Sequence, residues 1–133
     1  MPLTILVAGA TGLVGSAVMR QALTEERIRM VIALVRRPLG TPHPKLVEWS
    51  VNGDDLLSGL REEPVDAVIC CLGTTIRTVH GDKGKFVHVD KDLVVGLGRW
   101  ARTRGVPAFA VVSAMGADAQ SRIFYNRLKG EME

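Results

Sequence analysis

Three glycines near the start of the chain constrain its fold more than any other feature. An apolar, strand-like run over residues 3–8 breaks at Gly9, and Gly12 and Gly15 follow at intervals of three residues. An apolar helical pattern then begins at Leu13. The order of strand, glycine turn and helix is the arrangement that the pyrophosphate of a dinucleotide requires, because the free N–H groups at the start of the helix face the anion.

Each glycine has its own expected role in such a turn. Gly9 would let the chain turn sharply off the strand, Gly12 would let the backbone approach the phosphates, and Gly15 would let the helix pack close to the strand. The first interval is one residue longer than in the common dinucleotide fingerprint, so the match is inexact. Three incidental turn glycines are the alternative, and the position between a strand and a helix argues against it.

The composition fits one soluble α/β domain. A length of 133 residues suggests a single core, and 47% hydrophobic with 23% charged residues is ordinary for a globular protein. The net charge of +3 comes from scattered basic residues interleaved with acidic ones, unlike the clustered stripe of a nucleic-acid-binding protein. No apolar run approaches the ~18 residues of a membrane span, and no signal peptide opens the chain. We therefore expect a cytoplasmic protein without nucleic-acid or membrane partners.

The cysteines and histidines do not predict a metal site. Cys70 and Cys71 are adjacent on an expected strand and point to opposite faces, so a bridge between them is disfavoured. Two cysteines without a histidine at ligand spacing make no zinc site, and we interpret them as small buried apolar residues. His43, His80 and His88 share no spacing and are expected at the surface.

Strand and helix patterns alternate along the chain. This alternation predicts parallel strands joined by right-handed crossovers, and the near-continuous apolar strands predict a sheet covered by helices on both faces. The expected fold is therefore α/β, with a doubly wound parallel sheet. Strands are expected at residues 4–8, 30–35, 46–49, 67–71 and 108–112, and helices at residues 12–23, 54–60 and 86–103.

Two polar segments, residues 36–45 and 73–85, follow strands and are predicted to be loops. Enzymes that use the cofactor without a 2′-phosphate usually place an Asp or Glu about 20 residues beyond the glycines. Here that place holds Arg36 and Arg37. A guanidinium offers a planar fork that matches a phosphate, so the pair favours NADP(H) over NAD. The alternative is that both arginines merely flank a strand end.

The end of the chain carries the candidate chemistry. Ser113 follows a strand-like run, and Tyr125 and Lys129 come after it, four residues apart. On a helix these two side chains share a face, so the ammonium would favour the phenolate and bring the phenol closer to proton transfer at neutral pH. Ser113 at a carboxyl end of a strand would hydrogen-bond a substrate carbonyl. Taken alone, the Tyr and Lys pattern usually means a solvated helix face, and only its coincidence with the glycine turn makes it specific.

Four segments of the chain, in order, resemble the signature segments of the short-chain dehydrogenase/reductase superfamily. They look most like its atypical NAD(P)H-binding branch, which is related to the extended sugar-nucleotide epimerases. The resemblance covers essentially the whole chain and implies a Rossmann fold with one NAD(P)-binding domain over residues 1–133. The segments are GATGLVG at 9–15, CLGTT at 71–75, VVSAMGAD at 111–118 and YNRLKGE at 125–131.

The resemblance also implies roles for particular residues. In the family the Lys also holds the nicotinamide ribose, and the Tyr is the acid or base for hydride transfer. By that likeness the catalytic set would be Ser113, Tyr125 and Lys129. The cofactor would be met at its pyrophosphate by Gly9, Thr11, Gly12, Leu13 and Gly15, at its adenosine phosphate by Arg36 and Arg37, at its adenine by Asp54 or Asp55, and along its ribose by Gly73 and Thr74.

The chain departs from the family at its end. It stops at Glu133, about one helical turn beyond Lys129, whereas family members continue with a further strand and the segment that shapes the substrate pocket. We expect either a piece truncated at its C-terminus or a minimal cofactor-binding domain, with a short last helix over residues 120–133 that frays. Two functions stay open: an NADP(H)-dependent oxidoreductase acting on a carbonyl or alcohol, and an NADP(H)-binding regulatory or interaction domain without turnover. A homo-oligomer is compatible with both.

Overall fold

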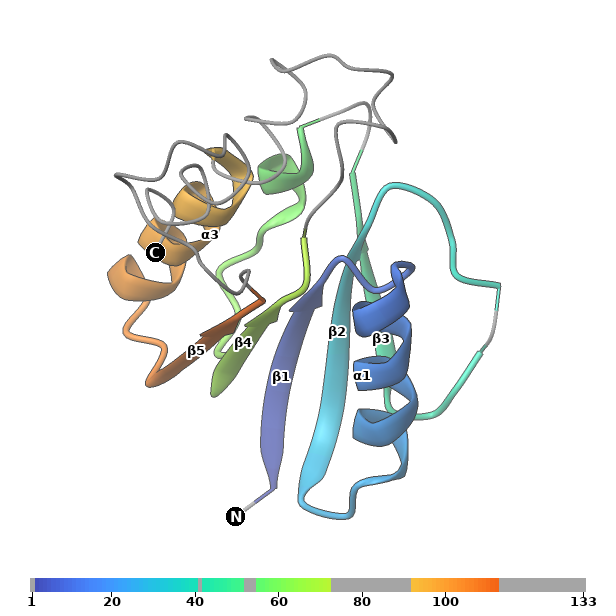
Figure 1. The fold of residues 1–133 in the computed structure, drawn as a ribbon. Helices are drawn as coiled ribbons and strands as arrows, with labels where there is room; N and C mark the ends of the chain where they lie inside the picture. Colours follow the sequence, from blue (N-terminus) through green and yellow to red (C-terminus); the bar gives the residue numbers. More distant parts are fainter. Residues whose placement is uncertain (1, 41, 52–54, 73–91, 113–133) are drawn as a thin grey trace, which may run out of the picture.

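A five-stranded parallel sheet forms the centre of the protein (Figure 1). The computed structural model describes residues 2–40, 42–51, 55–72 and 92–112. The strands are β1 (Leu3–Ala8), β2 (Ile28–Val35), β3 (Leu46–Ser50), β4 (Ala67–Cys70) and β5 (Ala108–Val111). The helices are α1 (Leu13–Thr24), the short 3-10 helix η1 (Leu56–Gly59) and α3 (Leu93–Thr103).

The order of the strands makes the sheet doubly wound. The strands lie in the order β3-β2-β1-β4-β5, so the chain starts in the middle, runs outward to β3 and then returns to the other side of β1. The direction of winding reverses between β1 and β4, and ligands of such sheets bind at that point, beyond the carboxyl ends of the strands. The predicted fold class is confirmed.

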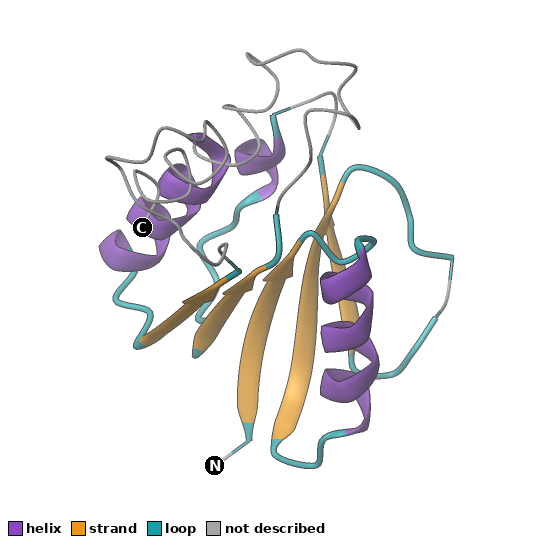
Figure 2. Cartoon of the chain, viewed as in Figure 1, coloured by secondary structure: helices purple, strands orange, loops and turns teal. Residues whose placement is uncertain are grey.

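Helices cover the two faces of the sheet in separate layers (Figure 2). On β1, Ile5 and Val7 belong to the core cluster that includes Met19 and Ala22 of α1. The alternate residues Leu6 and Ala8 belong to the cluster that η1 and α3 share on the other face. Successive side chains of a strand point to opposite faces, so both faces are apolar and the strand is a continuous apolar run.

The expected elements agree with the observed ones within about two residues, with one exception. The second predicted helix, residues 54–60, is only the four-residue helix η1. The third predicted helix, residues 86–103, contains α3 and ends where α3 ends, and its predicted start lies among residues 73–91, outside the described part of the chain. The predicted final helix, residues 120–133, also lies outside it.

The cysteines have the predicted character. Cys70 is fully buried in the core and Cys71 is half-buried, and neither forms a disulfide bond. Burial raises the pKa of the Cys71 thiol, which keeps it protonated at neutral pH. His43 is half-buried, and its Nδ1 accepts a hydrogen bond from the Lys45 amide at 3.1 Å, whereas His80 and His88 lie outside the described residues.

Two kinds of feature are absent from the part of the chain that the structure describes. None of its helices has the length and apolar character needed to cross a bilayer. Across the same residues, no group of three or more His, Cys, Asp or Glu side chains could hold a metal ion.

Candidate nucleotide-binding site

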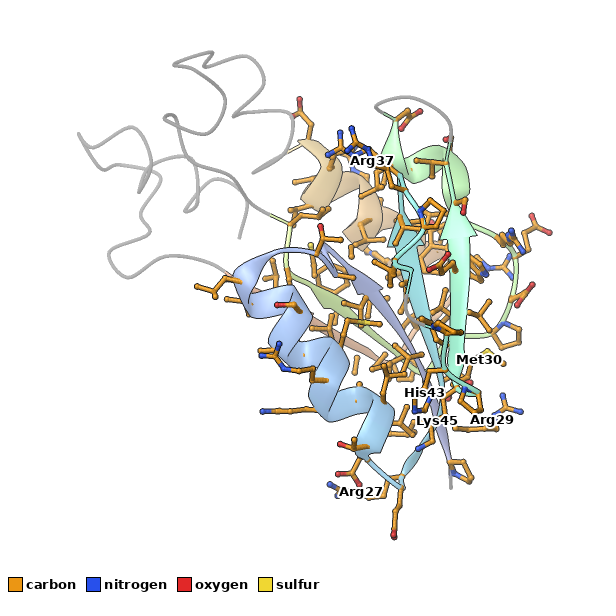
Figure 3. The ribbon with its side chains drawn as sticks, turned by 90° about the vertical axis from the view of Figure 1, so that its right-hand side faces the viewer. Arg27, Arg29, Met30, Arg37, His43 and Lys45 are labelled. Atoms are coloured by element: carbon orange, nitrogen blue, oxygen red, sulfur yellow. The ribbon has the colours of Figure 1, made fainter. Side chains whose placement is uncertain are left out.

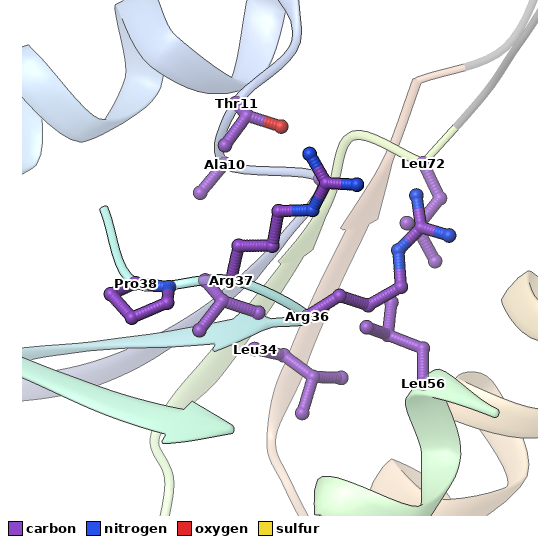
Figure 4. A pocket seen from close by; sticks show the side chains of 10 residues that line it. Ala10, Thr11, Leu34, Arg36, Arg37, Pro38, Leu56 and Leu72 are labelled. Atoms are coloured by element: carbon purple, nitrogen blue, oxygen red, sulfur yellow. The ribbon is translucent and has the colours of Figure 1, made fainter. Parts of the chain in front are cut away.

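A cavity of about 720 Å³ opens at the carboxyl ends of β1, β2 and β4 (Figure 4). Its volume falls within the range of small-molecule and cofactor sites. It lies where the winding of the sheet reverses, so its position is that of the ligand site in doubly wound folds. Ten described residues line it: Gly9, Ala10, Thr11, Leu34, Val35, Arg36, Arg37, Pro38, Leu56 and Leu72.

Gly9 turns the chain off β1 in a conformation that requires glycine. Its φ is +80°, which side chains with a Cβ rarely adopt. A Cβ there would also lie 2.6 Å from the carbonyl carbon and oxygen of Cys71, on the segment that follows β4. The glycine therefore allows the turn after β1 to pass directly beside the end of β4.

Gly15 and Gly12 differ in whether the fold leaves space for a Cβ. A Cβ at Gly15 would overlap the Gly9 carbonyl oxygen and lie 2.7 Å from the Gly9 carbonyl carbon, so α1 packs on the turn only because residue 15 is glycine. A Cβ at Gly12 would lie 3.6 Å from the Gly9 oxygen, which is ordinary contact, and its φ of −73° suits any residue. The fold itself does not need glycine at position 12.

The N-terminus of α1 is open. Gly12 is the N-cap, no side chain caps the helix, and its first turn carries no acidic residue. Leu13 is 91% exposed, and Val14 beside it is exposed as well. Because the first backbone N–H groups of a helix have no partners within it, this end of α1 is suited to an anion.

Arg36 and Arg37 supply the positive charge of the cavity. Both follow β2 directly and are exposed. Figure 4 shows the Arg37 guanidinium directed toward Thr11 in the glycine turn, and the Arg36 guanidinium directed toward Leu72. The two guanidinium groups thus point toward different sides of the cavity. The described lining of the cavity contains two cations and no carboxylate.

Other cationic side chains lie at the opposite end of the sheet and form hydrogen bonds within the protein. Figure 3 shows Arg37 at one end of the molecule and Arg27, Arg29 and Lys45 at the other. The Arg27 guanidinium pairs with Glu25 at 2.8 Å, which lowers the pKa of that carboxyl group through its hydrogen bond. Arg29 donates to the Thr4 hydroxyl at 3.0 Å, and Lys45 donates to the Glu25 carbonyl at 2.9 Å.

The apolar walls of the cavity are residues that the sequence analysis did not single out. Leu34 and Pro38 flank the arginines, and the end of the predicted second strand was a usable signal for them. Leu56 comes from η1, and no sequence signal connects that segment to the glycine turn. Leu72 comes from the segment after β4, inside the CLGTT motif at 71–75, and that motif was the usable signal for it.

The remaining predicted site residues fall into two groups. Asp55 is described, but it caps η1 by accepting a hydrogen bond from the Leu57 amide at 3.2 Å, and its neighbour Leu56 lines the cavity instead. Six predicted residues lie outside the described part of the chain: Asp54, Gly73, Thr74, Ser113, Tyr125 and Lys129.

Comparisons of the sequence with known proteins identify its family. A family model described as NAD(P)H-binding matches residues 9–132. The protein named FMP52, mitochondrial, of Eremothecium gossypii is 36% identical over 129 residues, which cover 96% of this chain and 57% of the relative. The protein HTATIP2 of Rattus norvegicus is 28% identical over 137 residues, which cover 98% of this chain and 55% of the relative. The chain thus spans little more than half the length of these curated relatives.

Solved structures share the fold at low sequence identity. MoeE5 in complex with UDP-glucose and NAD aligns over 90% of this chain and 39% of its own, with a TM-score of 0.66 and 22% identity. Uronate dehydrogenase from Agrobacterium tumefaciens aligns over 96% of this chain and 52% of its own, with a TM-score of 0.69 and 17% identity. Both likenesses support the Rossmann-type architecture.

The expected cytoplasmic location is wrong by the same comparisons. Relatives in Eremothecium gossypii and Saccharomyces cerevisiae, 36% and 32% identical, are both named as mitochondrial. The expectation rested on the lack of a membrane span and of a secretory signal peptide. Neither feature distinguishes the cytoplasm from the interior of an organelle, so the inference had no physical basis for that choice.

Proposed function

Because the chain belongs to the NAD(P)H-binding family, we propose that its cavity binds NADP(H) and that the protein transfers hydride between the nicotinamide and a carbonyl or alcohol. The resemblance to an atypical short-chain dehydrogenase/reductase is confirmed by the family match and by the fold of the structural neighbours. One observation carries the proposal: two arginines and the glycine turn that leads into the uncapped N-terminus of α1 line one cavity.

The described residues fit the chemical groups of a dinucleotide. The turn at Gly9 and the uncapped start of α1 suit the pyrophosphate, since backbone N–H groups and the helix dipole stabilise negative charge there. Leu34, Leu56 and Leu72 offer an apolar surface for the adenine. When bound, NADP(H) would supply or accept the hydride.

The preference for NADP(H) rests on charge. A cofactor without the 2′-phosphate is usually held by a carboxylate at the end of the second strand. Here Arg36 and Arg37 occupy that end, and no Asp or Glu belongs to the described lining of the cavity. A 2′-phosphate beside these guanidinium groups would form charge-assisted hydrogen bonds, which NAD has no group to replace.

The catalytic roles follow from the family likeness. Tyr125 would relay the proton, Lys129 would lower the pKa of its phenol and hold the nicotinamide ribose, and Ser113 would orient the substrate oxygen. Ser113 comes directly after Val112, whose amide donates to the Cys70 carbonyl at 3.0 Å and so extends the β4–β5 pairing. Val112 therefore lies at the carboxyl edge of the sheet, and this position supports the proposal.

We also propose a cellular location for the protein. Relatives named as mitochondrial support the mitochondrion as the compartment in which this chain works. Separation of mitochondria from cytosol, followed by detection of the protein in each fraction, tests this proposal. Recovery in the cytosolic fraction would contradict it.

The arginines provide the test of cofactor choice. We expect the wild-type chain to bind NADPH more tightly than NADH, and Arg36→Ala with Arg37→Ala to remove most of that difference. A lost charge-assisted contact is worth roughly 1.5–3 kcal/mol, so the ratio of the two dissociation constants should fall at least about tenfold. Fluorescence titrations with NADPH and NADH measure both constants.

A matched double variant controls for net charge. Arg20→Ala with Arg27→Ala removes the same charge from exposed positions that do not line the cavity, and it should leave the ratio unchanged. Equal affinity of the wild type for NADPH and NADH would refute the preference for NADP(H). A wild type that binds neither dinucleotide would refute the assignment of the cavity.

A further inference from the structure

The segment that carries the arginines is short and is anchored at both ends. Only Arg36, Arg37 and Pro38 separate the last residue of β2, Val35, from Leu39. At the first end, the Val35 carbonyl accepts a hydrogen bond from the Val51 amide at 3.0 Å, just beyond β3. The second anchor lies at the other end of the segment, at Leu39.

Leu39 is that second anchor, and a carboxylate holds it. The Leu39 amide donates to Oε1 of Glu48 at 2.8 Å, and its side chain packs against the core cluster beneath α1. Glu48 lies on β3 opposite Ala33, a member of the same cluster, so it projects from the α1 side of the sheet. The contact joins the start of the β2–β3 connection to the strand to which that connection leads.

We propose that Glu48 is a positioning residue: through the Leu39 amide it fixes the Arg36–Pro38 segment in the conformation that binds the 2′-phosphate. The role rests on the proposed function, because it concerns the same cavity and the same cofactor. Gly40 follows the anchor with a φ of +74°, in the left-handed region that favours glycine, so the chain changes direction directly after Leu39.

Because Glu48 is negatively charged, the direction in which its removal changes the affinity for NADPH tests its role. A carboxylate repels a phosphate, so its removal by electrostatics alone should strengthen the binding of NADPH. If Glu48 positions the arginines, its removal should weaken the binding instead, because the freed segment loses conformational entropy when the cofactor binds. The direction of the change separates the two effects.

The test compares three substitutions at one position. Glu48→Ala and Glu48→Met remove the acceptor, and we expect each to raise the dissociation constant of NADPH about tenfold while that of NADH changes by less than about twofold. Glu48→Gln keeps an oxygen acceptor without the charge and should bind NADPH as tightly as the wild type or more tightly. Glu26→Ala, an exposed acidic residue at the turn before β2, is the matched charge control and should change neither constant.

A second measurement follows the hydrogen bond without any nucleotide. Amide hydrogen exchange at Leu39 should become at least about tenfold faster in Glu48→Ala and Glu48→Met, and stay slow in Glu48→Gln. Thermal unfolding by circular dichroism shows whether each variant folds, and Glu48→Met, which retains the side-chain length, serves where the alanine variant does not.

The outcomes separate this proposal from the proposed function. If the wild type prefers NADPH and Glu48→Ala keeps the same preference, only the role of Glu48 is overturned. Equal behaviour of Glu48→Gln and Glu48→Ala also overturns it, because only the glutamine retains an acceptor. A wild type without preference for NADPH overturns the proposed cofactor choice and the role of Glu48 together, even where the Leu39 amide is protected.

Discussion

At the scale of single residues, the glycines of the first turn differ in whether the backbone requires them. Gly9 and Gly15 are required by the backbone, one through its positive φ and the other through the overlap that any Cβ would make with the Gly9 carbonyl. Gly12 has neither constraint. A glycine where the fold accepts other residues points to the ligand, because a side chain there would occupy the space in front of the helix N-terminus.

This difference gives a prediction for Gly12. Gly12→Val should leave the domain folded and raise the dissociation constant of NADPH at least about 100-fold, because the branched side chain obstructs the approach of the pyrophosphate. Gly15→Ala is the contrasting variant, in which the helix cannot pack and the melting temperature should fall sharply. Titration with NADPH and circular dichroism measure the two effects. Unchanged affinity in a folded Gly12→Val protein would refute the pyrophosphate site.

At the scale of elements, the position of η1 controls one wall of the cavity. Leu56 of η1 lines the cavity, and η1 rests on α3, where a Cβ at Gly96 would lie 2.5 Å from Cδ1 of Leu57. Two tryptophans support the same layer: Trp49 of β3 is fully buried and packs edge to face against Trp100 of α3, with ring centroids 6.4 Å apart. A change on α3 should therefore reach the cavity through η1.

Two glycines of α3 test this link. Gly96→Val should push η1 away, lower the melting temperature and weaken NADPH binding several-fold, although residue 96 does not line the cavity. Gly98→Ala is the control, because the nearest atom to its Cβ would be Phe109 Cζ at 3.9 Å. That variant should be more stable by up to about 1 kcal/mol through helix propensity alone, with unchanged affinity. Loss of affinity in Gly98→Ala, or none in Gly96→Val, would contradict the link.

At the scale of the whole molecule, the cavity exists only because distant segments end at one edge of the sheet. The glycine turn, the arginine segment, η1 and Leu72 lie far apart in sequence, and the parallel strands β1, β2 and β4 bring them together. The chain spans little more than half the length of its curated relatives, so turnover is best tested in a protein extended to their length.

In that longer protein, Tyr125 is expected to separate binding from chemistry. Tyr125→Phe should keep the affinity for NADPH and lower turnover of any accepted aldehyde or ketone by roughly 10² or more, because the phenol relays the proton. Lys129→Ala should reduce both, since its ammonium supports the phenol and the ribose. Oxidation of NADPH against a carbonyl panel measures turnover. Tight NADPH binding with equal residual rates in the wild type and Tyr125→Phe would favour a regulatory domain without turnover.

The sequence by itself determined the architecture and the glycine turn. Alternating apolar strands and helices predicted the doubly wound sheet because each strand is buried on both faces, and this leaves a local pattern that needs no partner to be identified. Gly9 and Gly15 were identifiable for a similar reason, since a turn between a strand and a helix imposes its backbone requirement locally. Arg36 and Arg37 could be identified as candidate cofactor-binding residues because they directly follow the predicted second strand.

Only the tertiary structure decided which side chains enclose the cavity. Leu56 lines it because η1 and the glycine turn reach the same cavity, a proximity that no local pattern encodes, and Leu72 lines it because the segment after β4 passes beside Gly9. Asp54 or Asp55 was predicted for the adenine; the structure shows Asp55 as the cap of η1, where its carboxylate accepts a hydrogen bond from the Leu57 amide. Glu48 was not singled out, since its partner Leu39 lies nine residues away across a turn. Contacts of this kind depend on how the chain returns to itself, which three-dimensional packing alone determines.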